Sequence, residues 1–140
     1  MKKESKKQVA IIETELEMRI FLSNLLKSNS YRTTIPRTGH EIETIKTSRP
    51  DLIILDAMMP RAGAIQLYQI IKSDEVLSCI PVIMLSTVDQ KLLFKYSRQD
   101  LSLPQPDNFL EKPPEAEELL EIIQKLVNKK TIKTNALYPE

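Results

Sequence analysis

The chain has 140 residues, 41% of them hydrophobic and 28% charged, which is the composition of one globular domain with its own core. Twenty Lys and Arg against nineteen Asp and Glu leave a formal net charge of +1, so no overall field favours nucleic acid or an anionic membrane. The basic start MKKESKK precedes only the short apolar run VAII, too little for a signal peptide or transmembrane helix. The single cysteine, Cys79, cannot form an internal disulfide, so we expect a cytoplasmic protein.

Short apolar runs alternate with amphipathic stretches along the chain. The runs predict strands at 9–12, 31–35, 52–55, 80–85 and 108–110. Apolar residues at helical spacing predict helices at 15–27, 40–46, 64–72, 89–98 and 115–130. This alternation indicates an α/β fold, with a parallel sheet covered by helices on both faces. Residues 1–7 are expected to form a basic N-terminal tail and residues 130–140 a loose C-terminal tail, which places the domain at 8–129.

Polar side chains stand where four of the predicted strands end. Glu13 follows VAII and Asp56 follows LIIL, while Ser86 follows VIML and Lys112 follows NFLE. In an open parallel sheet, ligands bind beyond the carboxyl ends of the strands. Two carboxylates, a hydroxyl and an ammonium at one edge are suited to holding a divalent metal and a phosphoryl group.

Three of these segments together resemble a known family. PDLIILDAMMP, PVIMLS and FLEKP, in this order and spacing, are similar to the receiver domains of bacterial two-component response regulators, which include the chemotaxis regulator. The resemblance covers roughly residues 8–129, taken here as a receiver domain. It implies a flavodoxin-like, doubly wound sheet of five parallel strands in the order 2-1-3-4-5.

The resemblance also implies the chemistry of the site. Asp56 would accept a phosphoryl group from a histidine kinase or a phosphotransfer protein and become an aspartyl phosphate. Mg²⁺ would be held by Glu13, Asp56 and the backbone carbonyl of Met58, because hard cations take oxygen ligands. Thr14 stands where the family has a second acidic ligand, so its part in holding the metal is open.

The resemblance implies that further residues bind the phosphoryl group or change conformation after phosphorylation. Ser86 and Lys112 would contact the phosphoryl oxygens, and Ser86 and Phe109 would change position on activation. The face formed by the fourth helix, the fifth strand and the last helix would then bind a downstream protein or a second copy of the chain. Four large apolar residues between 92 and 96 exceed what one buried helix face can take, which favours such a contact.

Three classes of function stay open at this point. The first is a phosphoaccepting receiver, a signalling domain rather than an enzyme. The second is a pseudo-receiver that binds partners without being phosphorylated, because Thr14 supplies no carboxylate to the metal. Thr14 also has a purely structural explanation, since Thr14 to Glu17 has the spacing of a capping box for the first helix. The third, a phosphatase with an Asp nucleophile, would need a second Asp where Met58 stands.

Overall fold

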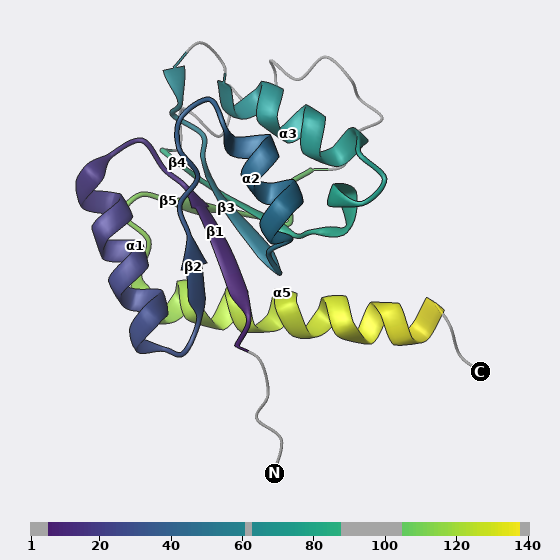
Figure 1. Ribbon diagram of the computed structural model, residues 1–140. Coiled ribbons are helices and arrows are strands. Elements are labelled where there is room, and N and C mark those ends of the chain that lie inside the picture. Colours follow the sequence, from purple (N-terminus) through teal and green to yellow (C-terminus); the bar gives the residue numbers. More distant parts are fainter. Residues whose placement is uncertain (1–5, 61–62, 88–104, 138–140) are drawn as a thin grey trace.

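The computed structural model describes residues 6–60, 63–87 and 105–137, and within these the chain forms a five-stranded parallel sheet flanked by helices (Figure 1). The strands are β1 (Gln8–Ile12), β2 (Arg32–Thr34), β3 (Leu52–Asp56), β4 (Val82–Ser86) and β5 (Asn108–Glu111). The helices are α1 (Leu16–Ser28), α2 (Glu41–Ser48), α3 (Gly63–Ser73), a short 3-10 helix η2 (Leu77–Cys79) and α5 (Ala116–Leu137). The strand order β2-β1-β3-β4-β5 confirms the predicted flavodoxin-like fold.

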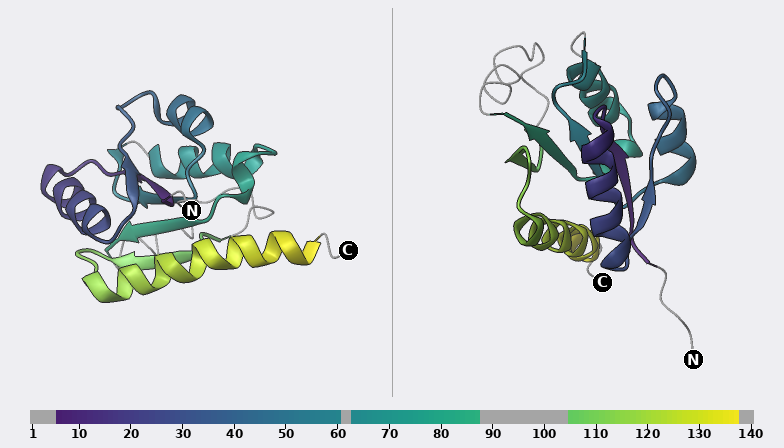
Figure 2. Two further views of the ribbon diagram at one scale, coloured as in Figure 1. Left: turned by 60° about the horizontal axis from the view of Figure 1, so that its bottom comes forward. Right: turned by 90° about the vertical axis from the view of Figure 1, so that its left-hand side faces the viewer.

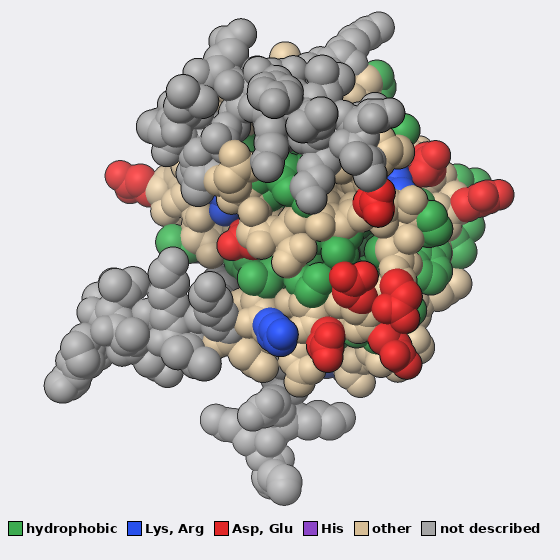
Figure 3. Space-filling view, turned by 180° about the vertical axis from the view of Figure 1, so that it is seen from behind, with side chains coloured by type: hydrophobic (Ala, Val, Ile, Leu, Met, Phe, Trp, Pro, Cys, Tyr) green, Lys and Arg blue, Asp and Glu red, His purple; other side chains and the backbone are tan. Residues whose placement is uncertain are grey.

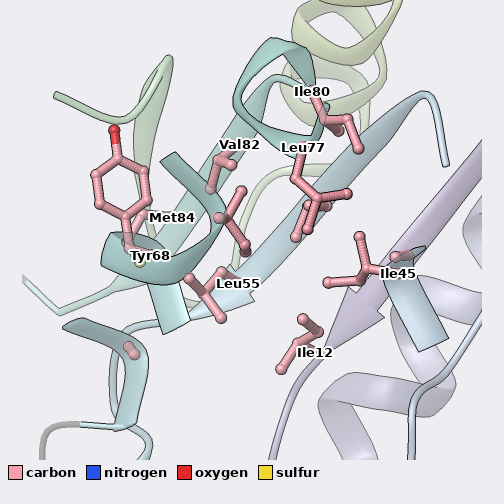
Figure 4. Packing of buried hydrophobic residues seen from close by; sticks show 12 residues of the cluster. Ile12, Ile45, Leu55, Tyr68, Leu77, Ile80, Val82 and Met84 are labelled. Atoms are coloured by element: carbon pink, nitrogen blue, oxygen red, sulfur yellow. The ribbon is translucent and has the colours of Figure 1, made fainter. Parts of the chain in front are cut away.

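Two apolar cores lie on the two faces of this sheet, with α1 and α5 over one face and α2 and α3 over the other (Figure 2). All five residues of β3 are buried, and the four apolar ones alternate between the cores. Ile53 and Leu55 join the core under α2 and α3, to which Ile71 also belongs. Figure 4 shows Leu55 in this core together with Tyr68 of α3. Leu52 and Ile54 join the core under α1 and α5. The run LIIL is apolar at each position because both of its faces are covered.

The observed elements differ from the predicted ones mainly at their ends. The second strand is shorter than 31–35, because Ile35 leaves the sheet and is 44% exposed. The fourth begins at Val82 instead of residue 80, since η2 and Pro81 precede it. The predicted helix at 89–98, with its apolar residues, lies outside the described residues. None of the described helices has the length and apolar character needed to cross a membrane.

The last helix is longer than the sequence indicates. We expected a helix at 115–130 followed by a loose tail, but α5 continues to Leu137 and extends past the sheet (Figures 1 and 2). At its start the Glu115 carboxylate accepts a hydrogen bond from the backbone N–H of Glu118 at 3.1 Å. Asp and Glu side chains gather on one part of the surface in the view from behind (Figure 3). Glu117 and Glu118 in the first turn of α5 stabilise the helix, because negative charges interact favourably with the positive end of the helix dipole.

Candidate functional site

The four polar residues predicted to converge do lie at one edge of the sheet. Glu13 follows β1, Asp56 ends β3, Ser86 ends β4 and Lys112 follows β5. Asp56 is 0% exposed, Ser86 1% and Glu13 5%. The backbone N–H of Lys112 donates to the Ser86 carbonyl at 3.2 Å, so sheet pairing continues into the site. Parallel strands therefore bring residues from four separate segments into one buried polar cluster.

Both carboxylate oxygens of Asp56 accept hydrogen bonds. Lys112 Nζ and the backbone N–H of Met58 each lie 2.8 Å from Oδ1. The Thr14 hydroxyl lies 2.5 Å from Oδ2, and the Thr14 backbone N–H lies 3.2 Å from the same oxygen. Burial acts to raise the pKa of Asp56, but the bonds from Lys112, Thr14 and Met58 outweigh it and hold the pKa below its usual value. The structure thus keeps Asp56 ionised and oriented.

Lys112 is the cation at the centre of the site. Its ammonium contacts Asp56 at 2.8 Å, Glu13 at 3.0 Å and Glu15 at 3.4 Å. Burial acts to lower the pKa of Lys112, but the hydrogen bonds and charges of Asp56 and Glu13 raise it overall. Lys112 is therefore protonated at neutral pH, with its charge directed at the carboxylates. The peptide bond from Lys112 to Pro113 is cis.

Glu13 is the least well satisfied group in the cluster. Its Oε2 accepts from Lys112 and from the backbone N–H of Glu15, both at 3.0 Å. Its Oε1 is buried and has no hydrogen-bond partner among the described residues. Burial raises the pKa of Glu13, and the nearby charge of Asp56 adds to that effect, whereas the bonds from Glu15 and Lys112 oppose it. An unsatisfied carboxylate oxygen at this point fits a cation, because one ammonium faces two buried carboxylates.

The described residues hold no group of three or more His, Cys, Asp or Glu side chains arranged to bind a metal ion. The predicted ligand Thr14 is neutral, and its hydroxyl is already bonded to Asp56. Met58 uses its N–H on Asp56, and its side chain is on the surface. The assignment of Glu13, Asp56 and the Met58 carbonyl to Mg²⁺ therefore stays a prediction.

The capping-box explanation of Thr14 is wrong. Helix α1 begins at Leu16, its N-cap residue is Glu15, and no side chain makes a cap hydrogen bond there. Thr14 lies one residue too early to cap the helix. Its hydroxyl binds Asp56, which is 42 positions away in the chain. Thr14 belongs to the site and not to the helix end.

The two predicted switch residues occupy neighbouring strands. Ser86 is buried at the end of β4, and Phe109 is a partly buried residue of β5. Phe109 packs against the core under α2 and α3. Their movement on activation stays a prediction. Sequence reasoning missed Glu15, although the spacing of carboxylates in ETE, just after the first strand, is a signal that was available.

Removing the Thr14 hydroxyl should weaken the fold in a pH-dependent way. Thr14→Val is expected to lower the free energy of unfolding by about 1 kcal/mol at pH 7, because a hydrogen bond to a charged group is lost. That bond helps to keep the pKa of Asp56 low, so its contribution is present above the usual carboxyl range and is lost as the pH falls through the folded pKa. Urea unfolding from pH 7 to pH 3 measures this. Thr47→Val, at an exposed threonine of α2, should show a difference that does not vary with pH.

The match to known proteins agrees with this geometry. Residues 9–124 match the response regulator receiver domain family, inside the predicted domain of 8–129. The chain therefore belongs to the response regulator receiver domain family, a family of signalling domains of two-component systems.

Relatives of this family differ greatly in overall size. The chain is 30% identical over 126 residues to hybrid signal transduction histidine kinase D of Dictyostelium discoideum, a match that covers 89% of this chain and 8% of that protein. It is 33% identical over 87 residues to the polar-differentiation response regulator DivK of Brucella anthropi, which covers 61% of this chain and 70% of DivK.

Solved structures show the same fold. The signal receiver domain of a signal transduction histidine kinase from Syntrophus aciditrophicus superposes with a TM-score of 0.75 at 25% identity, covering 88% of this chain and 91% of that one. The chemotaxis response regulator CheY4 of Vibrio cholerae gives a TM-score of 0.71 at 21% identity, covering 86% and 98%.

Proposed function

We propose that this chain is a phosphoaccepting receiver in which Asp56 takes a phosphoryl group from a histidine kinase or a phosphotransfer protein. The observation that carries the proposal is the state of Asp56, a buried and ionised carboxylate held by Lys112 and by the Met58 N–H at 2.8 Å each. A carboxylate is a nucleophile only when ionised, and its attack needs a fixed direction. The hydrogen bonds around Asp56 favour both conditions.

For this reaction the protein has to supply mainly the positioning of the reacting groups and the neutralisation of charge. An Asp56 oxygen attacks the phosphorus of a phosphohistidine, the P–N bond breaks, and its electron pair stays on the imidazole nitrogen. Lys112 then faces the oxygens of the new acyl phosphate, and Ser86 lies at the end of the neighbouring strand to bind another. Glu13, Asp56 and the Met58 carbonyl would hold Mg²⁺, which would supply further positive charge against the phosphoryl oxygens.

The surface beside the site suits a docked phosphodonor protein. On α1, Leu16 is 60% exposed and Ile20 is 50% exposed, one helical turn apart, and Phe21 beside them is 36% exposed. Helix α1 begins only two residues after Thr14, which contacts Asp56, so the strip starts near the site. A donor packed on α1 would bring its phosphohistidine to the site.

We also propose that the protein works in the cytoplasm. Its response would be passed on by the predicted face of the fourth helix, β5 and α5.

The test is incubation with acetyl phosphate with and without Mg²⁺, followed by intact mass measurement. The wild type should gain one phosphoryl group only when Mg²⁺ is present, and Asp56→Asn should gain none, because an amide cannot act as the nucleophile. Asp51→Asn is the matched control, since this partly buried Asp at the opposite end of β3 should leave the gain unchanged. A phosphoryl group that still appears on Asp56→Asn would refute the assignment.

One contact favours the second candidate, a pseudo-receiver that binds partners without phosphorylation. The Thr14 hydroxyl at 2.5 Å satisfies Oδ2 of Asp56, while Lys112 and Met58 satisfy Oδ1. A buried carboxylate whose two oxygens both accept hydrogen bonds is stabilised in its unphosphorylated form. In that case the wild type would gain no mass with acetyl phosphate at any Mg²⁺ concentration.

A further inference from the structure

The ammonium of Lys112 has no hydrogen-bond donor to spare. It contacts carboxylate oxygens of Asp56 at 2.8 Å, Glu13 at 3.0 Å and Glu15 at 3.4 Å. A lysine ammonium carries three N–H groups, so three acceptors use its full capacity. A phosphoryl oxygen can therefore bind Lys112 fully only after one of the three carboxylates has given way.

The three carboxylates differ in how easily they can leave. While the phosphoryl donor approaches and Asp56 is still a carboxylate, the side chains of Asp56 and Glu13 are both 0% exposed, and either one would become an uncompensated buried charge without the ammonium. The side chain of Glu15 is 61% exposed, and its contact is the longest of the three. Water can hydrate a released Glu15 carboxylate at little cost, because exposed ion pairs contribute little free energy.

We propose that Glu15 is a positioning residue whose carboxylate holds Lys112 in the resting state and is displaced from it by the phosphoryl group. The inference rests on the proposed phosphorylation of Asp56. Until a phosphoryl oxygen arrives, Glu15 occupies the third N–H of Lys112 and adds a negative charge at the mouth of the site. Both effects oppose the entry of an anion, so Glu15 slows phosphorylation.

The side chain of Glu15 can be changed without disturbing the rest of the cluster. The backbone N–H of Glu15 donates to Glu13 Oε2 at 3.0 Å, and this bond does not depend on the carboxylate. Glu15 is the N-cap residue of α1 but makes no side-chain cap bond. Glu15→Gln therefore removes the charge while it keeps the size, the backbone bond and the helix start.

The experiment measures the initial rate of phosphorylation by acetyl phosphate in Mg²⁺, read by intact mass. Glu15→Gln should be phosphorylated about threefold faster than the wild type at low ionic strength, the scale of one exposed ion pair. Salt shortens the reach of exposed charges, so the gain should shrink at 0.5 M NaCl. Glu17→Gln, an exposed carboxylate in the first turn of α1, makes the same change in net charge and should keep the wild-type rate.

Each outcome decides the matter. A faster Glu15→Gln with unchanged thermal stability supports the positioning role, since a merely structural residue would not raise the rate when removed. Equal rates for Glu15→Gln and Glu17→Gln, or a slower Glu15→Gln, would overturn the inference and leave the proposed function intact. No phosphorylation of any protein, the wild type included, would overturn both.

Discussion

Replacing Lys112 with methionine should lower the free energy of unfolding by about 3 kcal/mol at pH 7, because removing one partner of a buried ion pair leaves the other charges uncompensated. Two buried carboxylates, Asp56 and Glu13, rely on this ammonium at 2.8 and 3.0 Å. Methionine fills a similar volume, so the loss is one of charge and not of packing. Urea unfolding at pH 7 gives the number.

The sign of the pH dependence distinguishes this explanation from a packing defect. Without the ammonium, the pKa of Asp56 and of Glu13 should rise, and both carboxyls become neutral as the pH falls through the carboxyl range. The deficit of Lys112→Met should therefore be largest at neutral pH and shrink toward pH 4. Adding Glu13→Gln should recover part of the loss at pH 7. Lys125→Met, at an exposed position of α5, serves as the control, and a deficit independent of pH in Lys112→Met would contradict the electrostatic account.

Replacing Thr14 with aspartate should tighten Mg²⁺ binding on the order of tenfold, because a carboxylate adds an anionic oxygen ligand where a neutral hydroxyl stands. The same change removes the 2.5 Å hydrogen bond to Asp56 and puts a like charge in its place. Without metal, we expect the variant to unfold about 1–2 kcal/mol more easily than the wild type. Saturating Mg²⁺ should reverse that order, since a ligand bound only by the folded state stabilises it.

Calorimetric titration with Mg²⁺, together with thermal unfolding with and without the metal, measures both effects. Glu13→Gln is the companion variant, because the buried and unsatisfied Oε1 of Glu13 is the atom that best fits a cation. If Glu13→Gln abolishes Mg²⁺ binding while Thr14→Asp adds little to it, Glu13 alone replaces the missing acidic ligand. Heat of binding in none of the three proteins would contradict the magnesium site and favour the pseudo-receiver.

The fold was predictable because its signals are local. The run LIIL, apolar at each position, indicates a strand covered on both faces, and the structure buries all of it. The edge strand was harder to place, since β2 is covered less completely and its residues are only exposed or partly buried. The end of α5 was also missed, because TIKTNAL has little of the apolar periodicity on which the prediction depended.

The site was predictable as a set of strand ends but not as a network. The strand ends bring Glu13, Asp56, Ser86 and Lys112 together, as expected from parallel topology. The capping box, one of two explanations left open for Thr14, was wrong because it is a local pattern, while the partner of the Thr14 hydroxyl is 42 positions away. Glu15 was overlooked because an exposed glutamate near a helix start has many ordinary explanations. Only its contact with the Lys112 ammonium shows that Glu15 belongs to the site.

The ion pairs of Lys112 also link formation of the site to the pairing of β5 with the sheet. Lys112 is 99 positions from Glu13 and 56 positions from Asp56, so both contacts close only when β5 has joined the sheet. A growing chain that ends before Lys112 has the two carboxylates but not the cation that compensates them. β5, which follows β1 and β3 in the chain, thus brings the charge that compensates the buried acidic residues at the ends of those two strands. Pairing of β5 with the sheet and formation of this charged cluster therefore depend on one another.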